Sequence, residues 1–449
     1  MLLNKLRNKK MSHAQTIALG FFVMIMVGAL LLMLPISSRS GQWTSFGSSL
    51  FTAASASCVT GLVVVDTFTY WTTFGQIIIL IMIQIGGLGF VSMGVLFAFF
   101  LKRKIGLAKR DLIQESVSAM RLAGVVKLVR NILLSTLMFE GVGAILLSIR
   151  FIPVFGWGKG IYFGIFHSIS AFCNAGFDLM GQYGQYSSLV NWYDDIVVNV
   201  VIMALITIGG LGFIVWEDLY HNKWHFKKYS LHTKIVLLTS MTLIFGGAIL
   251  FGIFEHGNLM EGMSVKNTIL TSLFASVTTR TAGFNTLDLG EMTQASKLLT
   301  GILMFIGGSP GSTAGGIKTT TIVVMIFYIW SNIRNQSGCN ILGRRIADDD
   351  IKKASMVFCL NLFLSVVAML IISSVQLFQL DDLMLEVVSA IGTVGLSAGI
   401  TRDLLPISKL VIIFLMYLGR IGSMTFALSF AHRKKAAAVR YPVENINVG

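Results

Sequence analysis

Val59-Thr60-Gly61-Leu62 is the stretch that decides the fold, because three variants of it recur along the chain. They are Asn174-Ala175-Gly176-Phe177, Thr281-Ala282-Gly283-Phe284 and Thr393-Val394-Gly395-Leu396. The four glycines lie 115, 107 and 112 residues apart in a chain of 449 residues. A pattern repeated at such regular spacing predicts four copies of one structural unit.

A second glycine-containing element follows each tetrapeptide after an apolar stretch. Its versions are Ile85-Gly86-Gly87-Leu88-Gly89, Ile208-Gly209-Gly210-Leu211-Gly212, Ile306-Gly307-Gly308 and Leu418-Gly419-Arg420-Ile421-Gly422. The two elements keep the same order in all four copies, which supports the division into four units. Arg420 stands where the other three versions have their second glycine.

The apolar composition indicates a membrane protein. Hydrophobic residues make up 54% of the chain and charged residues only 12%. Crossing the hydrocarbon core of a bilayer takes roughly 20 apolar residues. Apolar stretches recur throughout, and the clearest are Ile17–Leu34, Phe74–Leu101, Ile196–Trp216, Ile235–Phe254, Ala354–Phe378 and Leu410–Phe430. We therefore expect a multi-pass protein of the cell membrane.

The basic charge is distributed in a way that predicts orientation rather than nucleic-acid binding. The formal net charge is +14, and 25 of the 35 Lys and Arg residues fall in five segments. These are the N-terminus to Lys10, residues 102–130, 221–234 and 331–353, and the tail Arg433–Gly449. An excess of basic residues marks the cytoplasmic side of membrane proteins. Both termini and the three long linkers are therefore predicted to be cytoplasmic.

The stretch before each tetrapeptide is too short to cross a membrane. These stretches are Ser45–Cys58, Ile161–Cys173, Lys266–Thr279 and Asp382–Gly392. Such lengths predict re-entrant pore helices. The fold class is therefore an all-α integral membrane protein with four tandem helix, pore helix, loop, helix repeats. Eight spans would surround a pseudo-fourfold axis along the membrane normal. The repeats would occupy residues 1–101, 102–216 with a basic linker, 217–330, and 331–449 with the tail.

The fourfold glycine pattern with an interrupted third copy resembles the Trk/Ktr/HKT superfamily of potassium transporters, and more narrowly the membrane subunit of bacterial Ktr-type uptake systems. The resemblance covers about residues 15–432. It implies a bacterial plasma membrane location and a homodimer of this chain. It also implies a cytoplasmic ring of Rossmann-type regulatory subunits that bind ATP or ADP. No cofactor is expected within the chain itself.

The four tetrapeptides are predicted to form an ion selectivity filter. Replacing the water around an ion requires backbone carbonyls in layers around one axis, and glycine permits the necessary backbone angles. All sixteen tetrapeptide residues would then present K⁺ with backbone carbonyls rather than side chains. By resemblance, glycine in all four copies favours potassium over sodium.

The second element of the third copy continues into a glycine-rich loop. The predicted gate residues there are Gly307, Gly308, Ser309, Pro310, Gly311, Ser312, Thr313, Ala314, Gly315, Gly316 and Lys318. So many glycines and a proline cannot stay helical. Unwound backbone at membrane depth must face protein or water, so the loop should lie beneath the filter and obstruct the path. Lys318 would either add to this barrier or reach the cytoplasmic interface.

Several charged residues lie close to the predicted path. Arg420 should point into it below the filter, since a mid-span cation usually faces a pore or a partner. Arg280 is expected to brace its loop through carbonyl contacts. Glu140, in the middle of an apolar stretch, has no partner that the sequence identifies, and a structural or a functional role is equally open. Among the outer acids, which would concentrate cations, Asp178 is the best candidate.

These features predict a potassium-translocating subunit without a catalytic constellation. A sodium- or proton-coupled symporter stays open as an alternative. Residues Gly311 to Thr319 approach a phosphate-binding loop, but Ile317 separates glycine from Lys318, so a membrane enzyme is disfavoured. Flux in liposomes without nucleotide would separate transport from enzymatic function. Deleting part of the gate loop or neutralising Arg420 should raise flux without changing the preferred ion.

Overall fold

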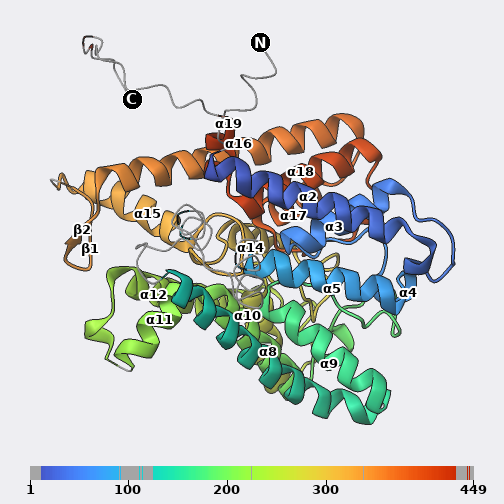
Figure 1. Ribbon diagram of the computed structural model, residues 1–449. Helices are drawn as coiled ribbons and strands as arrows, with labels where there is room; N and C mark the ends of the chain where they lie inside the picture. Colours follow the sequence, from blue (N-terminus) through green and yellow to red (C-terminus); the bar gives the residue numbers. More distant parts are fainter. Residues whose placement is uncertain are drawn as a thin grey trace, which may run out of the picture.

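The computed structural model describes residues 12–89, 92, 111, 114, 125–223, 225–336, 338–430, 442 and 444. Several predicted features lie outside these residues. They are the N-terminus to Lys10, most of segment 102–130, the end of the stretch Phe74–Leu101 and most of the tail from Arg433. The described chain is mostly helical, and its helices pack around a central region of loops (Figure 1).

Four long helices begin the four units. They are α2 (His13–Met33), α8 (Val125–Phe155), α12 (Leu231–Phe254) and α16 (Asp348–Val375). Among the described residues, these four are long and apolar enough to cross a membrane. Side chains determine where two of them start, because Ser12 and Ser230 accept a hydrogen bond from the backbone N–H three residues later.

A short helix follows each long one and packs against it. These helices are α3 (Phe46–Cys58), α9 (Trp157–Phe172), α13 (Val265–Thr278) and α17 (Leu380–Gly392). Each agrees with its predicted stretch to within four residues. Ser45 and Ser264 cap two of them. Helices of this length cannot cross a bilayer, so after each of them the chain turns back through the loop that follows.

The third helix of each unit closes the arrangement. These helices are α5 (Thr73–Leu88), α10 (Ile196–Leu211), α14 (Gln294–Phe305) and α18 (Pro406–Ile421). Each packs against the short helix of the next unit, so that α5 contacts α9, α10 contacts α13 and α14 contacts α17. The last, α18, contacts the first short helix, α3. The four units therefore form a closed ring.

Two of the predicted apolar stretches are not continuous helices. The predicted span Ile196–Trp216 breaks at Gly212, where α10 meets α11 (Phe213–Asn222) at 95°. The predicted span Leu410–Phe430 breaks at Gly422, before α19 (Ser423–Phe430). Helix α5 ends at Gly89. These glycines have φ values of 98°, 92° and 81°, in the left-handed region where glycine ends helices without steric cost.

Because of these breaks, the described helices do not provide eight uninterrupted spans. The four long helices qualify by length and composition, and the α10–α11 pair makes at most a fifth. Helix α5 and α15 (Thr319–Ile333) are apolar but shorter. The prediction of eight crossings therefore requires the third helices to span together with the segments beyond their breaks.

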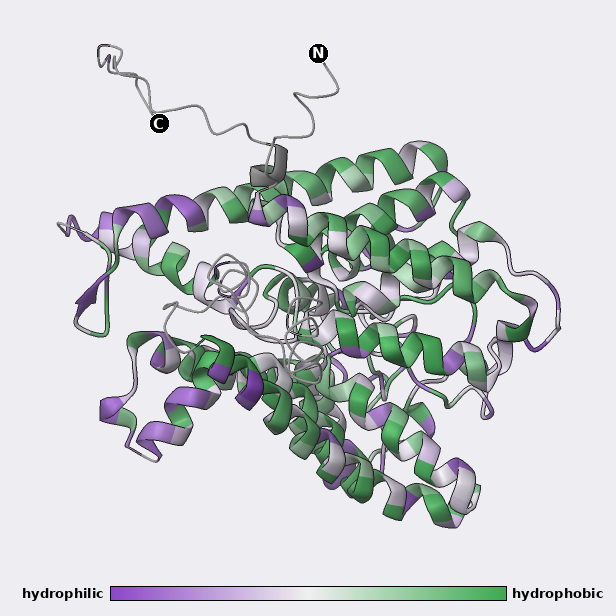
Figure 2. Ribbon diagram, viewed as in Figure 1, coloured by the Kyte–Doolittle hydropathy of each residue, from purple (hydrophilic) through white to green (hydrophobic). Residues whose placement is uncertain are grey.

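Short elements complete the described chain. They are η1 (Pro35–Ser37), α4 (Thr67–Tyr70), η2 (Val190–Trp192), η3 (Phe226–Lys228), η4 (Ile400–Asp403) and the antiparallel strands β1 (Asn340–Ile341) and β2 (Arg344–Arg345). In the view of Figure 1, α11 and the β1–β2 hairpin lie at one end of the molecule and α4 lies near the other. Figure 2 shows hydrophilic residues gathered at the α11 end, whereas the helices between are mainly hydrophobic.

The main core surrounds the short helices. Phe51, Phe166, Phe172 and Phe274, from α3, α9 and α13, are completely buried in it. In contrast, the outward face of α8 exposes large apolar side chains. An apolar surface of this kind suits contact with lipid. The carboxyl-terminal parts of the short helices are thus buried, and the loops that follow start from packed positions.

Candidate ion pathway

The structure brings the four tetrapeptide glycines together in a closed ring. A Cβ built on Gly61 would lie at most 2.7 Å from the carbonyl oxygen of Ala175, in the next tetrapeptide. The same limit holds for Gly176 against Ala282, for Gly283 against Val394 and for Gly395 against Thr60. Each glycine therefore faces a backbone carbonyl of the following loop. No side chain fits at any of the four positions.

The four loops share an unusual backbone conformation. The glycines have φ values of 96°, 70°, 84° and 92°. The residues two positions earlier are also left-handed, and they are Val59, Asn174, Thr281 and Thr393. β-branched residues rarely adopt this conformation, and three of these four are β-branched. Strain repeated at equivalent positions indicates that packing imposes one geometry on all four loops.

Hydroxyl groups of the short helices hold the loops in this geometry. The hydroxyl oxygens of Ser55 and Ser389 accept the N–H of Gly61 at 3.0 Å and of Gly395 at 2.9 Å. Ser170 donates instead to the carbonyl of Phe177 at 2.7 Å, and Thr278 donates to that of Phe284. The sequence analysis missed these residues. The available signal was a hydroxyl residue five or six positions before every glycine.

The second glycine element has a packing role that the sequence analysis did not identify. A Cβ on Gly86, Gly209 or Gly419 would lie less than 2.5 Å from a carbonyl oxygen of Ser57, Phe172 or Ile391, respectively. Each of these glycines therefore lets the third helix abut the carboxyl end of its own short helix. In the third unit, Gly307 instead faces the carbonyls of Gly315 and Ile317. The interrupted unit thus packs against itself.

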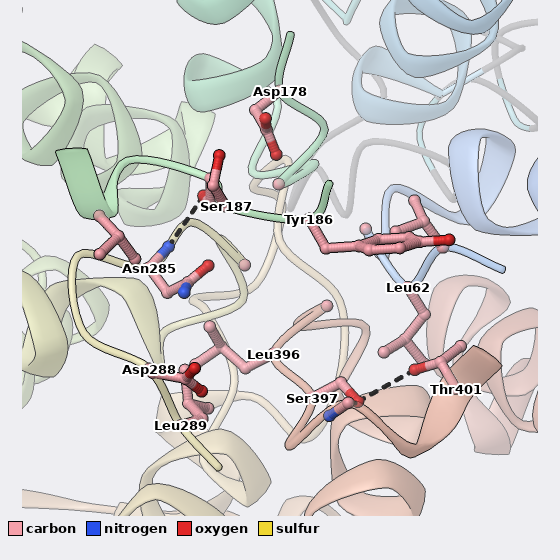
Figure 3. Close-up of a pocket in the computed structure, with 18 of the residues that line it drawn as sticks. Leu62, Asp178, Tyr186, Ser187, Asn285, Asp288, Leu289, Leu396, Ser397 and Thr401 are labelled. Atoms are coloured by element: carbon pink, nitrogen blue, oxygen red, sulfur yellow. Dashed lines mark hydrogen bonds between the residues drawn. The ribbon is translucent and has the colours of Figure 1, made fainter. Parts of the chain in front are cut away.

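A cavity of about 480 Å³ opens on one side of the glycine ring. Figure 3 shows that all four loops contribute to its wall, with Leu62, Asp178, Asn285 and Leu396 as one representative of each. Four acids line it, namely Asp66, Asp178, Asp288 and Glu291, against one base, Arg402. The cavity is therefore a negatively charged antechamber to the ring.

Two of these acids have distinct roles. Asp66 is structural, because its carboxylate accepts the N–H groups of Phe68 at 3.0 Å, Thr69 at 2.6 Å and Tyr186 at 3.0 Å. Within the described residues, Asp178 accepts the N–H of Met180, at 2.9 Å. Burial raises the pKa of Asp178 to about 7, and the negative charge of Asp66 acts in the same direction. The charge of Asp178 therefore changes near neutral pH.

The loop of residues 307–316 lies on the other side of the ring. Ile306 pairs with Ile317 as a short parallel bridge that closes its base. Its backbone is bonded to α10, where Ser309 donates to the carbonyl of Gly210 at 3.1 Å and Thr313 to that of Gly209 at 3.2 Å. Beyond the α10 break, Phe213 donates to the carbonyl of Gly311 at 2.7 Å.

Contacts to the fourth unit fix the far side of the loop. Gly316 donates its N–H to the carbonyl of Gly419 at 3.3 Å. A Cβ on Gly315 would collide with the side chain of Thr393, the left-handed residue of the fourth tetrapeptide. The loop therefore lies directly against the fourth tetrapeptide loop.

Other predicted gate residues make contacts within the loop. The hydroxyl of Ser312 donates to the carbonyl of Ser309 at 2.7 Å, and the carbonyl of Gly308 accepts from Thr319 at 3.1 Å. The carbonyl of Pro310 faces Gly212. The ammonium of Lys318 donates to the carbonyl of Ala314 at 2.8 Å. Lys318 therefore folds back onto the loop.

Arg420 joins three segments. Its guanidinium donates to the carbonyl of Thr313, in the 307–316 loop, and to the carbonyls of Gly86 and Gly87, at the end of α5. The sequence placed Arg420 near this loop, and the structure agrees. Its attachment to the first unit was not foreseen, because the partners are 333 and 334 residues away.

The remaining charged candidates differ from expectation. Glu140 has a partner after all, since Gln84 donates to its carboxylate at 3.1 Å. The side chain of Arg280 does not brace its loop within the described residues, where its Nε and Nη2 have no hydrogen-bond partner. Its carbonyl takes part instead and accepts the amide of Asn174 at 3.2 Å.

Apolar helices long enough to cross a membrane, arranged around a ring of backbone loops with an acidic antechamber, define a membrane transport protein. The chain belongs to the TrkH family of cation transport proteins, whose model matches residues 5–439. The resemblance first seen in the four tetrapeptides is thereby confirmed.

Individual relatives cover nearly the whole chain. It is 42% identical to the potassium/sodium uptake protein NtpJ of Enterococcus hirae over the full length of both. It is 40% identical to the Ktr system potassium uptake protein B of Bacillus subtilis, covering 97% of this chain and 96% of that one. The crystal structure of the potassium transporter TrkH from Vibrio parahaemolyticus matches with a TM-score of 0.73 at 18% identity. That match covers 94% of this chain and 86% of the other, so the two share a fold.

Proposed function

We propose that this protein carries potassium ions into the bacterial cell through one pore per chain, with the four tetrapeptides as its selectivity filter. The observation that carries this proposal is the closed glycine ring, in which every glycine faces a carbonyl of the next loop. Carbonyl oxygens around one axis can replace the hydration shell of a monovalent cation without any catalytic group. The backbone carbonyls of all sixteen tetrapeptide residues are the candidate ligands.

The architecture that goes with this function has eight crossings and a pseudo-fourfold axis along the membrane normal. The ring of contacts between consecutive units supports the axis. The glycine breaks support crossings in which each third helix passes the membrane with the segment after its break. The basic segments of the sequence orient the pore, with both termini in the cytoplasm and the acidic cavity outside.

The gate of this pore is the 307–316 loop together with Lys318 and Arg420. The loop obstructs the path by its bulk, because it lies against the inner side of the tetrapeptide loops. The two cations oppose a passing K⁺ by charge, an effect that the low dielectric of a protein interior strengthens. Their hydrogen bonds to loop carbonyls hold both charges at the obstruction.

Sodium is the second candidate ion. Glycine at all four filter positions favours potassium, but the name of the Enterococcus hirae relative includes both ions. Uptake of both must therefore be measured. Coupling of potassium entry to sodium or protons is an alternative mechanism that the same measurement addresses.

Control by a separate cytoplasmic subunit is part of the proposal. Two of the relatives are named as Ktr system potassium uptake proteins, and a system implies additional components. The basic segments of this chain are too short to fold as a nucleotide-binding domain, for which well over 50 residues are needed. A homodimer of this chain with a Rossmann-type ring that binds ATP or ADP would supply the regulation. Anionic lipid is the competing partner for the same basic segments.

Flux through the purified protein in liposomes tests the proposal. We expect potassium entry driven by an imposed membrane potential, without nucleotide, and weaker sodium entry. Gly176→Ser should raise the apparent KM for potassium by about fivefold or more, since a Cβ at φ 70° is strained and meets the carbonyl of Ala282. Gly141→Ser is the control, because nothing lies within 4 Å of a Cβ there. Absence of flux, or equal effects of the two substitutions, would refute the assignment.

A further inference from the structure

The amide side chain of Asn174 contacts loops on both sides of it. Its Nδ2 donates to the carbonyl of Arg280 at 3.2 Å and to the hydroxyl of Thr281 at 3.4 Å, in the third unit. Its Oδ1 accepts from Oγ1 of Thr313 at 3.4 Å, in the 307–316 loop. Val59, Thr281 and Thr393 occupy the equivalent positions in the other units and carry no amide. One filter residue thus joins two filter loops to the gate.

Thr313 is the corresponding residue on the gate side. It is fully buried, and its single hydroxyl proton is shared between Oδ1 of Asn174 and the carbonyl of Phe172, at the end of the second short helix, 3.1 Å away. Its backbone N–H and carbonyl are bonded to Gly209 and Arg420. Through Thr313, the backbone therefore ties the loop to α10 and α18, and the hydroxyl ties it to the second filter loop.

The atoms around the contact between Asn174 and Thr313 are tightly packed. A Cβ on Gly209 would lie 2.9 Å from both Oδ1 of Asn174 and Oγ1 of Thr313. All three residues are buried. Thr313 cannot move away without breaking its hydrogen bonds to the filter side or moving the amide of Asn174 with it. Buried polar groups that lose a partner carry a free-energy penalty, so the amide would reorient towards a new one.

We infer that Asn174 and Thr313 couple the gate to the filter, so that displacing the 307–316 loop relaxes the preference for potassium. The inference rests on the proposed function and deepens it. Ion preference depends on the positions of the carbonyls, and Asn174 positions the second and third filter loops against each other. The prediction from the sequence places ion selection in the filter alone, independent of the gate. Because of this contact, the preference for potassium depends on the gate loop as well as on the filter.

Removing the hydroxyl of Thr313 tests the coupling. Thr313→Val keeps the shape of the side chain and all backbone hydrogen bonds. In liposomes, its preference for potassium over sodium should fall by a factor between about 2 and about 10, the range for one lost hydrogen bond. Thr313→Ser retains the hydroxyl and should restore the wild-type preference. Thr313→Ala is the second variant, should valine fail to pack.

Matched controls come from the same region. Ser312→Ala removes the neighbouring hydroxyl, which bonds only within the loop to Ser309 and Ala314. It should leave the preference unchanged, because the hydroxyl of Thr313 keeps its contacts to Phe172 and Asn174. Asn174→Asp can accept from Thr313 but cannot donate to the carbonyl of Arg280, so it should also lower the preference. Combining it with Thr313→Val should give less than the sum of the two effects, because both act on one network.

The outcomes separate the coupling from the proposed function. An unchanged preference in both Thr313→Val and Thr313→Ala, in protein that elutes like the wild type, would overturn the coupling. So would an equal loss of preference in Ser312→Ala, which would point to general loop packing. If Gly176→Ser alters potassium affinity while the Thr313 variants do not alter preference, the filter assignment survives and the coupling fails. If the wild type carries no potassium, the proposed function fails first.

Discussion

Nη2 of Arg420 lies 2.7 Å from the carbonyl oxygen of Gly87, so a hydrogen bond joins the fourth unit to the first, although the two residues are 333 positions apart in the sequence. The two residues occupy equivalent positions in their units. A guanidinium carries several donors, so Arg420 reaches this carbonyl and the loop at once. The one residue that replaces the second glycine therefore joins the fourth unit to the first and to the 307–316 loop.

Neutralising Arg420 should open the pathway. Arg420→Ala removes a cation at the obstruction and its bond to Thr313, so potassium flux should rise roughly tenfold or more. Because the hydroxyl of Thr313 still contacts Phe172 and Asn174, the ion preference should stay near that of the wild type. Uptake rates for potassium and sodium in the same vesicles measure both quantities. Arg150→Gln, which removes an ion pair with Asp195, is the control. A level or reduced flux in folded protein would contradict the gate.

Two neighbouring glycines should respond differently to the same substitution. Gly209→Ala places a methyl group against the carbonyl of Phe172, and overpacking of this kind costs about 1–3 kcal/mol or more. Gly210→Ala meets only the amide of Asn174, at an ordinary contact distance of 3.5 Å. Thermal unfolding in detergent should therefore show a clearly lower Tm for Gly209→Ala. Equal Tm values for the two variants would mean that α10 does not abut the short helix as described.

Removing one hydroxyl behind the filter should weaken it. Ser389→Ala leaves the N–H of Gly395 without its side-chain acceptor, at a cost of about 1–3 kcal/mol for a buried donor. The fourth loop should then relax, and the apparent affinity for potassium should fall several-fold. Ser374→Ala, on an exposed face of α16, is the control and should behave like the wild type. Wild-type affinity in Ser389→Ala would remove this serine from the filter support.

Potassium uptake should depend on pH through Asp178. Its pKa is raised to about 7, so the carboxylate loses its charge as the external pH falls through that value. A less negative antechamber attracts fewer cations, and the apparent KM should rise by about twofold at acidic pH. Asp178→Asn should show the higher KM at every pH. The apparent KM between pH 5 and 9 provides the test, and a wild-type dependence retained in Asp178→Asn would assign the titration to another group.

Much of the fold was predictable from local patterns. The short helices were located within four residues because their length and their position before a glycine are both visible in the sequence. The breaks at Gly212 and Gly422 were missed, because a glycine inside an apolar stretch does not by itself reveal a positive φ. Packing against the 307–316 loop accompanies the break at Gly212.

The sequence predicts which residues belong to the candidate site but not the contacts among them. The tetrapeptides, the glycine-rich loop and Arg420 all stand out by residue type and spacing. The contact between Asn174 and Thr313 does not, because asparagine at this position looks like an ordinary variant of the pattern. The serine and threonine residues that hydrogen-bond the tetrapeptide loops do not stand out in the sequence either, since serine and threonine are common in membrane helices.

The sequence by itself determined the membrane class, the four units and the residues that belong to the pathway. Hydropathy and spacing carry this information, because they depend on residues close together in the chain. Only the tertiary structure decided which carbonyl each glycine faces, where the loop docks and what Arg420 and Thr313 hold. These contacts join residues more than 100 positions apart, and they form only when the ring of units closes and brings their backbones within hydrogen-bonding distance.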